Sequence, residues 1–147
     1  MPKNYGQACP VAKTLELIGD RWTLLVVRDL LMGKTKFAEL LESLPGLAPN
    51  ILSDRLKHLE ASGIIEQKQY NDHPPRVEYK LTASGRELGL VVGALFTWGS
   101  KHLYGDLALV DEQCGHEVGV AFYCPECERP SDTRRMHRKE KKTSARQ

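Results

Sequence analysis

The sequence lacks the features that would place it in a membrane or outside the cell. No apolar run approaches the roughly 20 residues needed to cross a bilayer, and the longest, such as 24–27 and 88–96, are short or interrupted by glycine. The N-terminal residues are not followed by an apolar segment with a small-residue cleavage site, which a secretory signal would require. We therefore expect a cytoplasmic protein without a membrane partner.

The sequence also lacks a recognisable catalytic motif. An enzyme would show a nucleophile with its base, a paired acid and base, or a glycine-rich loop that cradles phosphate. None of these is visible, and isolated cysteine, histidine and acidic residues do not define an active site. We therefore expect a protein that performs no chemistry on a substrate.

Net positive charge is confined to the C-terminus. The 147-residue chain has a net charge of +2, but residues 133–147 hold seven Lys or Arg and one Glu, which leaves −4 for residues 1–132. We expect this basic segment to be a disordered tail because it has no apolar periodicity. It is either an electrostatic arm for DNA or a solvated terminus. The net charge of the chain therefore does not indicate DNA binding, which has to be inferred from the sequence patterns.

Helical periodicity dominates the first 61 residues. Apolar residues recur at spacings of three and four from 11 to 32, which predicts one helix with a buried face, ended by the glycine that follows. A shorter helical pattern begins at Lys36 and stops at the Pro45-Gly46 turn. The next segment, Pro49–Ala61, places leucines on one face and polar side chains on the other. Two helices joined by a tight turn, the second with a polar outer face, are typical of a helix-turn-helix.

A change of pattern after this segment predicts a β-hairpin. Residues 64–70 and 77–81 are rich in β-branched and aromatic side chains, and the turn formers at 71–76 predict a six-residue loop between two strands. A hairpin directly after a helix-turn-helix is a wing. Thr82 then suits the N-cap of a last, strongly apolar helix that reaches about Leu103. That helix, with the first one, forms a subunit interface or adds a layer to the monomer's own core, and we favour the interface.

Several strings in this order are familiar from one protein family. They are Cys9-Pro10, LELIGDRWTLLVVRDLL, Phe37-Ala38-Glu39-Leu40, LSDRLKHLEASGII and PPRVEYKLTASG. Residues 7–103 closely resemble the HxlR-type family of winged helix-turn-helix transcriptional regulators. The resemblance implies a mainly α fold with a small β-hairpin, and a homodimer that binds an operator and represses or activates transcription. It also implies that the first and last helices make the dimer contacts.

The helix predicted at 49–61 is the candidate for the major groove of DNA, which admits one helix. A basic wing beside it would neutralise backbone phosphate. A two-fold dimer predicts an inverted-repeat operator with half-sites about 10–10.5 bp apart, or a multiple of that, and repression is the favoured mode. The expected DNA-binding residues are Lys36, Asn50, Ser53, Arg55, Lys57, Lys68 and Arg76. The alternative is a non-enzymatic protein-interaction module that uses the winged fold and a zinc knuckle.

Residues 105–132 form a separate Cys- and His-containing appendage. Cys114, His116, Cys124 and Cys127 provide the Cys₃His set found in structural zinc sites, although the first pair is spaced more tightly than usual. Structural zinc is the prediction, with a disulfide or dithiol and plain reduced thiols as the alternatives. Zinc would make this segment a small zinc-knuckle appendage.

Cys9 lies just before the first predicted helix. A helix N-terminus lowers the pKa of a thiol and favours the reactive thiolate. The family resemblance adds that some relatives sense oxidants or electrophiles through this cysteine. Cys9 is therefore a redox-sensing candidate, with an oxidant or small molecule as the expected effector. The alternative is a small packing residue.

Overall fold

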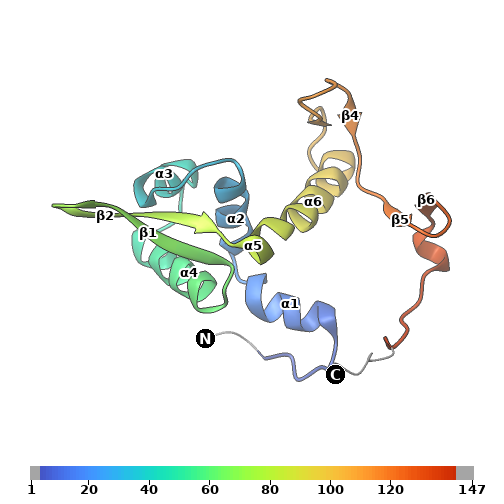
Figure 1. Ribbon diagram of the computed structural model, residues 1–147, viewed down its shortest axis with the longest axis horizontal. Helices are drawn as coiled ribbons and strands as arrows, with labels where there is room; N and C mark the ends of the chain where they lie inside the picture. The colour runs from blue at the N-terminus through green and yellow to red at the C-terminus, as the bar shows by residue number, and fades with distance from the viewer. Residues whose placement is uncertain (1–3, 142–147) are drawn as a thin grey trace. The chain divides into compact units, whose positions relative to one another are not determined.

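The computed structural model describes residues 4–141. The chain divides into two compact units, Met1–Phe96 and Thr97–Gln147, and each is described by itself. None of the described helices has the length and apolar character needed to cross a membrane. The first unit runs in the order α1 (Pro10–Ile18), α2 (Thr23–Leu31), α3 (Phe37–Ser43), α4 (Pro49–Ala61), β1 (Ile65–Asp72), β2 (Pro75–Leu81), α5 (Ala83–Glu87) and the greater part of α6 (Gly89–His102) (Figure 1).

A leucine-rich core holds the first unit together. Leu40 of α3 and Leu52 and Leu59 of α4 are fully buried, and they pack with Val26 and Val27 of α2. Each such side chain contributes about 1.5–3 kcal/mol to the stability of the folded state, because its apolar surface is removed from water. Helix α2 contacts both α3 and β2, while α4 contacts β1. The helix-turn-helix formed by α3 and α4 is thus fixed to the base of the wing by one shared core.

The single helix expected from 11 to 32 is in fact two helices, so that prediction was wrong. Helix α1 ends at Gly19, and α2 starts after Trp22, whose φ of 79° lies in the left-handed region. A Cβ at Gly19 would collide with the carbonyl oxygen of Leu15. The apolar spacing continues through the break because Leu17 and Trp22 pack against the same core. Periodicity alone could not reveal a turn inside such a pattern.

The last helix is also divided. Thr82 is the N-cap, as expected, and its Oγ1 accepts the backbone N–H of Gly85 at 3.2 Å. The helix stops at Leu88, however, and resumes as α6. Glycines at 85 and 89 weaken the helix here, since glycine costs about 1 kcal/mol relative to alanine in a helix interior.

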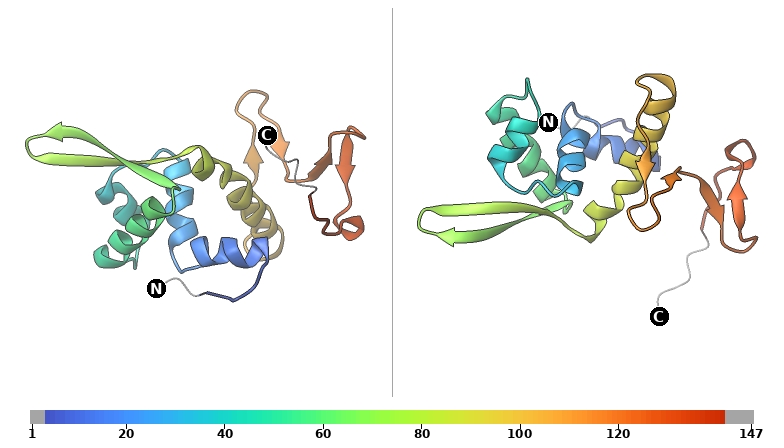
Figure 2. Two further views of the ribbon diagram at one scale, coloured as in Figure 1. Left: turned by 60° about the horizontal axis from the view of Figure 1, so that its bottom comes forward. Right: turned by 90° about the horizontal axis from the view of Figure 1, so that it is seen from above.

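The wing is confirmed, but its strands are longer and its turn tighter than expected. In the antiparallel pair, Ile65 lies opposite Leu81 and Asp72 opposite Pro75, which leaves residues 73–74 as the turn instead of a six-residue loop. Asn71 and Asp72 are residue types that favour turns, yet they belong to the strand pair, because strand pairing uses only backbone groups. The register shifts beside Tyr70, which marks a bulge. Figures 1 and 2 show the hairpin extending beyond α3 and α4.

The second unit contains two small antiparallel hairpins after the end of α6. They are β3 (Leu109–Val110) with β4 (Glu117–Val118), and β5 (Phe122–Cys124) with β6 (Arg129–Ser131), followed by the 3-10 turn η1 (Thr133–Arg135) (Figure 2). No side chain between 97 and 141 is fully buried. Residues 142–147 of the expected tail lie outside the described residues, so its disorder stays a prediction.

Candidate DNA interface

Helix α4 has the bounds predicted for the recognition helix, Pro49–Ala61. Proline occupies its first turn, where the missing N–H removes no intrahelical bond. The buried leucines of the helix fix its orientation, and the opposite side carries Asn50 and Lys57, both exposed, and the half-buried Ser53. These three lie at helical spacing, so they form one polar strip on the outside of the helix-turn-helix. The strip offers amide, hydroxyl and ammonium groups to a ligand.

Arg55 contacts the protein itself. Its Nε donates to the carbonyl oxygen of Arg21 at 3.0 Å, and its guanidinium lies 3.7 Å from the carboxylate of Asp20. One turn further along α4, the Nε2 of His58 lies 2.9 Å from the carbonyl oxygen of Leu17. Arg55 thus fastens α4 to the turn between α1 and α2, and His58 fastens it to the end of α1. Arg55 therefore positions the recognition helix, and its expected DNA contact stays a prediction.

The base of the wing is fixed and its outer part is exposed. The backbone N–H of Tyr79 donates to the carbonyl oxygen of Thr35 at 2.8 Å, and Gln67 Nε2 donates to the Glu60 carboxylate at 3.0 Å. Burial, followed by the charge of Glu60, raises the pKa of Tyr79. Lys68 and Arg76 lie further out on the two strands with exposed side chains. The outer part of the wing thus carries Lys68 and Arg76, and its stem is anchored to α4 and to the segment just before α3.

Lys36 joins the wing to the first helix of the helix-turn-helix. It is the N-cap residue of α3, and its Nζ lies 5.6 Å from the centre of the Tyr70 ring. In the first turn of α3, the carboxylate of Glu39 accepts the backbone N–H groups of Thr35 and Lys36 at 3.0 and 3.1 Å. These bonds, the first from Thr35, lower the pKa of Glu39. Tyr70 was not predicted from the sequence as a contact of Lys36, although its aromatic ring next to the predicted turn of the wing could have suggested one.

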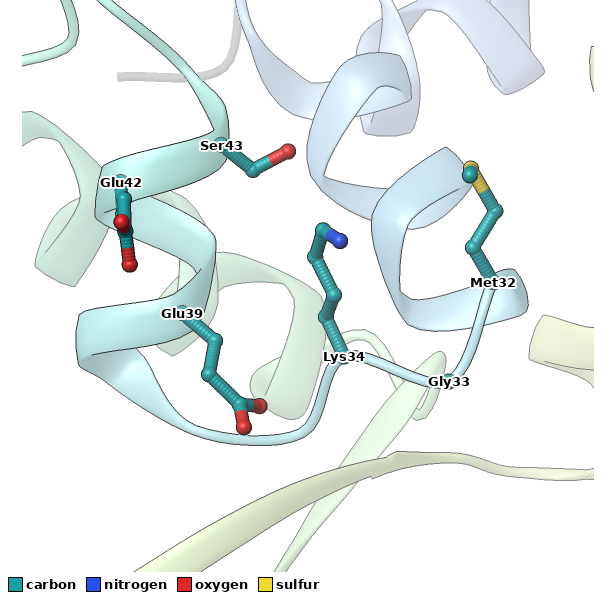
Figure 3. Close-up of a pocket in the computed structure, with 6 residues that line it drawn as sticks. All are labelled: Met32, Gly33, Lys34, Glu39, Glu42 and Ser43. Carbon is teal, nitrogen blue, oxygen red and sulfur yellow. The ribbon is translucent and has the colours of Figure 1, made fainter.

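An open cavity of about 440 Å³ lies between the end of α2 and α3. Figure 3 shows the Lys34 side chain rising into it between Met32 on one side and Glu42 and Ser43 on the other. Small-molecule sites are mostly apolar and enclosed, whereas this lining is charged and open. The cavity is therefore a poor receptor for an apolar effector.

The cysteines lie at three places in the fold. Cys9 is the N-cap residue of α1, and Cys114 lies in the turn between β3 and β4, near the exposed His116. Cys124 is the last residue of β5, and Cys127 lies in the turn between β5 and β6. Hydrogen bonds from Cys127, first from its backbone N–H and then from its thiol, lower the pKa of Cys124. Among residues 4–141 no three potential ligands are grouped closely enough to hold a metal. The zinc expectation is therefore still a prediction.

A helix-turn-helix followed by a two-stranded wing defines the winged-helix class of DNA-binding proteins. Residues 17–106 match the HxlR-like helix-turn-helix family, and the chain belongs to that family. It is 42% identical over 98 residues to the uncharacterized HTH-type transcriptional regulator sll1512 of Synechocystis sp. strain PCC 6803, an alignment that covers 67% of this chain and 73% of the relative.

Solved structures give the same picture. The candidate transcription factor PA1607 has a TM-score of 0.82 at 32% identity, with 95% of this chain and all of that chain covered. The reduced form of the redox regulator HypR has a TM-score of 0.60 at 35% identity, with 63% of this chain and 92% of that chain covered. The protein is thus a transcriptional regulator with a helix-turn-helix domain, as its sequence predicted.

Proposed function

We propose that this regulator represses transcription by placing α4 in the major groove of an operator while the wing rests on the neighbouring backbone. The observation that carries the proposal is the exposed strip of Asn50, Ser53 and Lys57 on a helix whose other side is locked into the core. Asparagine, serine and lysine bond base edges or phosphates. Lys68 and Arg76 on the wing, together with Lys36 at the start of α3, supply the phosphate contacts.

We propose further that the protein binds as a homodimer. Helix α6 has no fully buried residue and exposes Leu90, Leu95 and Trp98, while α1 exposes Val11 and Leu15 on one side. Apolar helical faces of this kind are typical of protein interfaces. Light scattering should then give a mass of twice the 16.5 kDa of the chain. Leu95→Glu should shift the protein towards the monomer, and a wild-type monomer at micromolar concentration would contradict the proposal.

The operator proposal is tested by selection from random duplexes followed by titration of the selected site. An inverted repeat with half-sites about 10–10.5 bp apart, or a multiple of that, is expected. Lys57→Ala and Arg76→Ala should each weaken binding and reduce the slope of log affinity against log salt by about one. Lys13→Ala removes the same charge from α1 and serves as the control. Recovery of no preferred sequence would favour the protein-interaction alternative instead.

Cys9 is the proposed sensor of an oxidant. It is half-buried at the start of α1, the helix whose end is bonded to α4 through His58, so a change at Cys9 has a covalent and hydrogen-bonded route to the recognition helix. Diamide should weaken operator binding by the wild type and leave Cys9→Ser unaffected. Equal responses of the two proteins would remove Cys9 as the sensor.

A further inference from the structure

The turns of the two C-terminal hairpins have the same backbone arrangement. In the second, Cys124 and Arg129 face each other across a turn, Cys127 is the fourth residue counted from Cys124, and Glu128 has a φ of 52°. In the first, Asp111 and His116 face each other, since the Asp111 N–H donates to the His116 carbonyl at 3.0 Å. Cys114 is then the fourth residue and Gly115 has a φ of 72°. Residue for residue, Asp111 and Cys114 occupy the positions of Cys124 and Cys127.

The hydrogen bonding of the two turns agrees with this match. The Cys124 sulfur accepts backbone N–H groups of Cys127 and Glu126. The Asp111 Oδ1 accepts the backbone N–H of Gln113, two residues on, at 2.7 Å, as the Cys124 sulfur accepts that of Glu126. In both turns a side chain that ligates metals therefore sits at the first position, with a cysteine three residues later. Thiolates and carboxylates are both zinc ligands.

His116 has a different place. It corresponds to Arg129 and lies outside the turn, just before β4, so the match between the two turns does not make it a ligand. The sequence pattern drew attention to His116 because histidine is a common zinc ligand, and it overlooked Asp111. The matching backbone conformation of the two turns favours Asp111 as the fourth ligand, and the His116 ligand stays an untested prediction.

The hairpins also need a stabiliser other than a core. Val118, Val120, Phe122 and Tyr123 are each between 40 and 60% exposed, and each hairpin pairs only two or three residues per strand. Segments too small to bury a core usually depend on disulfides or a structural metal. The two sulfurs of the second turn border a hollow of about 180 Å³, which leaves space beside them.

We propose that Asp111, Cys114, Cys124 and Cys127 of one chain bind a single zinc ion that joins the two hairpins into a zinc ribbon. The ligand set is one carboxylate and three thiolates in a closed, four-coordinate structural site. Zinc binding then releases the thiol protons and supplies the folding free energy that the exposed apolar side chains do not. The site goes beyond the proposed operator binding and does not depend on it.

The test uses the full chain, purified without chelator and titrated with zinc against a chromophoric competitor. About one zinc per chain is expected. Asp111→Ala should weaken zinc binding at least about tenfold, Cys124→Ser should abolish it, and the matched control His116→Ala should leave it unchanged. Less than a tenth of an equivalent, half an equivalent shared between two copies, or loss with His116→Ala but not with Asp111→Ala would each overturn the proposal.

Cobalt provides a second readout that does not depend on a loss of binding. The Co²⁺-loaded protein should show tetrahedral absorption bands and thiolate charge transfer. Asp111→Cys should intensify the charge-transfer band and tighten binding, because a fourth thiolate replaces the carboxylate. An unchanged band in this variant, or a Cys124–Cys127 disulfide in protein purified under reducing conditions, would overturn the assignment.

Discussion

The ammonium group of Lys36 lies 5.6 Å from the centre of the Tyr70 ring, close enough for a cation–π contact. Lys36 begins α3, and Tyr70 stands at the bulge of the wing strand β1. The bulge gives Tyr70 no partner in the strand register, and its ring is available to the helix-turn-helix. The contact therefore ties the exposed part of the wing to the first helix of the helix-turn-helix.

Replacement of Tyr70 by Ala should lower the free energy of unfolding by about 0.5–1 kcal/mol, the value of an exposed cation–π contact. Tyr70→Phe keeps the ring and should remain close to the wild type. Urea denaturation of the three proteins measures the difference. If Phe costs as much as Ala, the hydroxyl group and not the ring makes the interaction.

Alanine substitutions at two nearby cations of α4, Arg55 and Lys57, should affect stability and DNA binding differently. Arg55→Ala removes the hydrogen bond to the Arg21 carbonyl and the ion pair with Asp20, and should cost about 0.5–1.5 kcal/mol of stability, because a charged donor that holds α4 in place is lost. Lys57→Ala removes an exposed side chain and should leave stability within about 0.5 kcal/mol while it weakens operator binding. Thermal unfolding and fluorescence anisotropy on the same samples check both results. A stable Arg55→Ala protein with weakened binding would make Arg55 a DNA contact after all.

Gly85→Ala should be among the more damaging small substitutions. A Cβ there would collide with the backbone carbonyl oxygen of Ile64, which cannot rotate away as a side chain could. The expected cost is about 2–3 kcal/mol. Ser84→Ala, one residue earlier, loses the hydroxyl bonds to the Gly63 carbonyl and to the Thr82 hydroxyl and should cost about 0.5–1 kcal/mol. Chemical denaturation measures both losses of unfolding free energy. If Gly85→Ala and Ser84→Ala lose the same amount, the backbone around Gly85 moves to accommodate the added Cβ.

Glu39 makes the stability of α3 depend on acid pH. Its pKa in the folded chain is lowered from an ordinary value of 4.5, so the carboxylate stabilises the folded state above pH 4.5. That stabilisation is lost as the pH falls through the depressed folded value. Glu39→Ala should thus lower Tm at pH 7, and the gap from the wild type should narrow as the pH falls through the depressed pKa of the folded chain. Glu42→Ala, which removes a carboxylate from the same helix, is the matched control.

The local patterns of the sequence predicted those parts of the fold that depend on near neighbours. Leucines at helical spacing after Pro49 predicted α4 with its observed bounds, and two runs of β-branched and aromatic residues after it predicted the wing. The break at Trp22 could not be predicted, because both flanking helices bury their faces in one core and the apolar spacing runs on without a gap.

By itself the sequence determined the family, the recognition helix and the position of the polar strip, since periodicity and motif order are properties of the chain alone. Only the tertiary structure decided which cations face inward and which outward. Arg55 and Lys57 are two residues apart, yet one meets the carbonyl of Arg21 and the other meets solvent. It also placed Asp111 and Cys114 at the same turn positions as Cys124 and Cys127, because a left-handed residue, Gly115 or Glu128, closes each of these two turns, and this match is the basis for proposing Asp111 as a ligand.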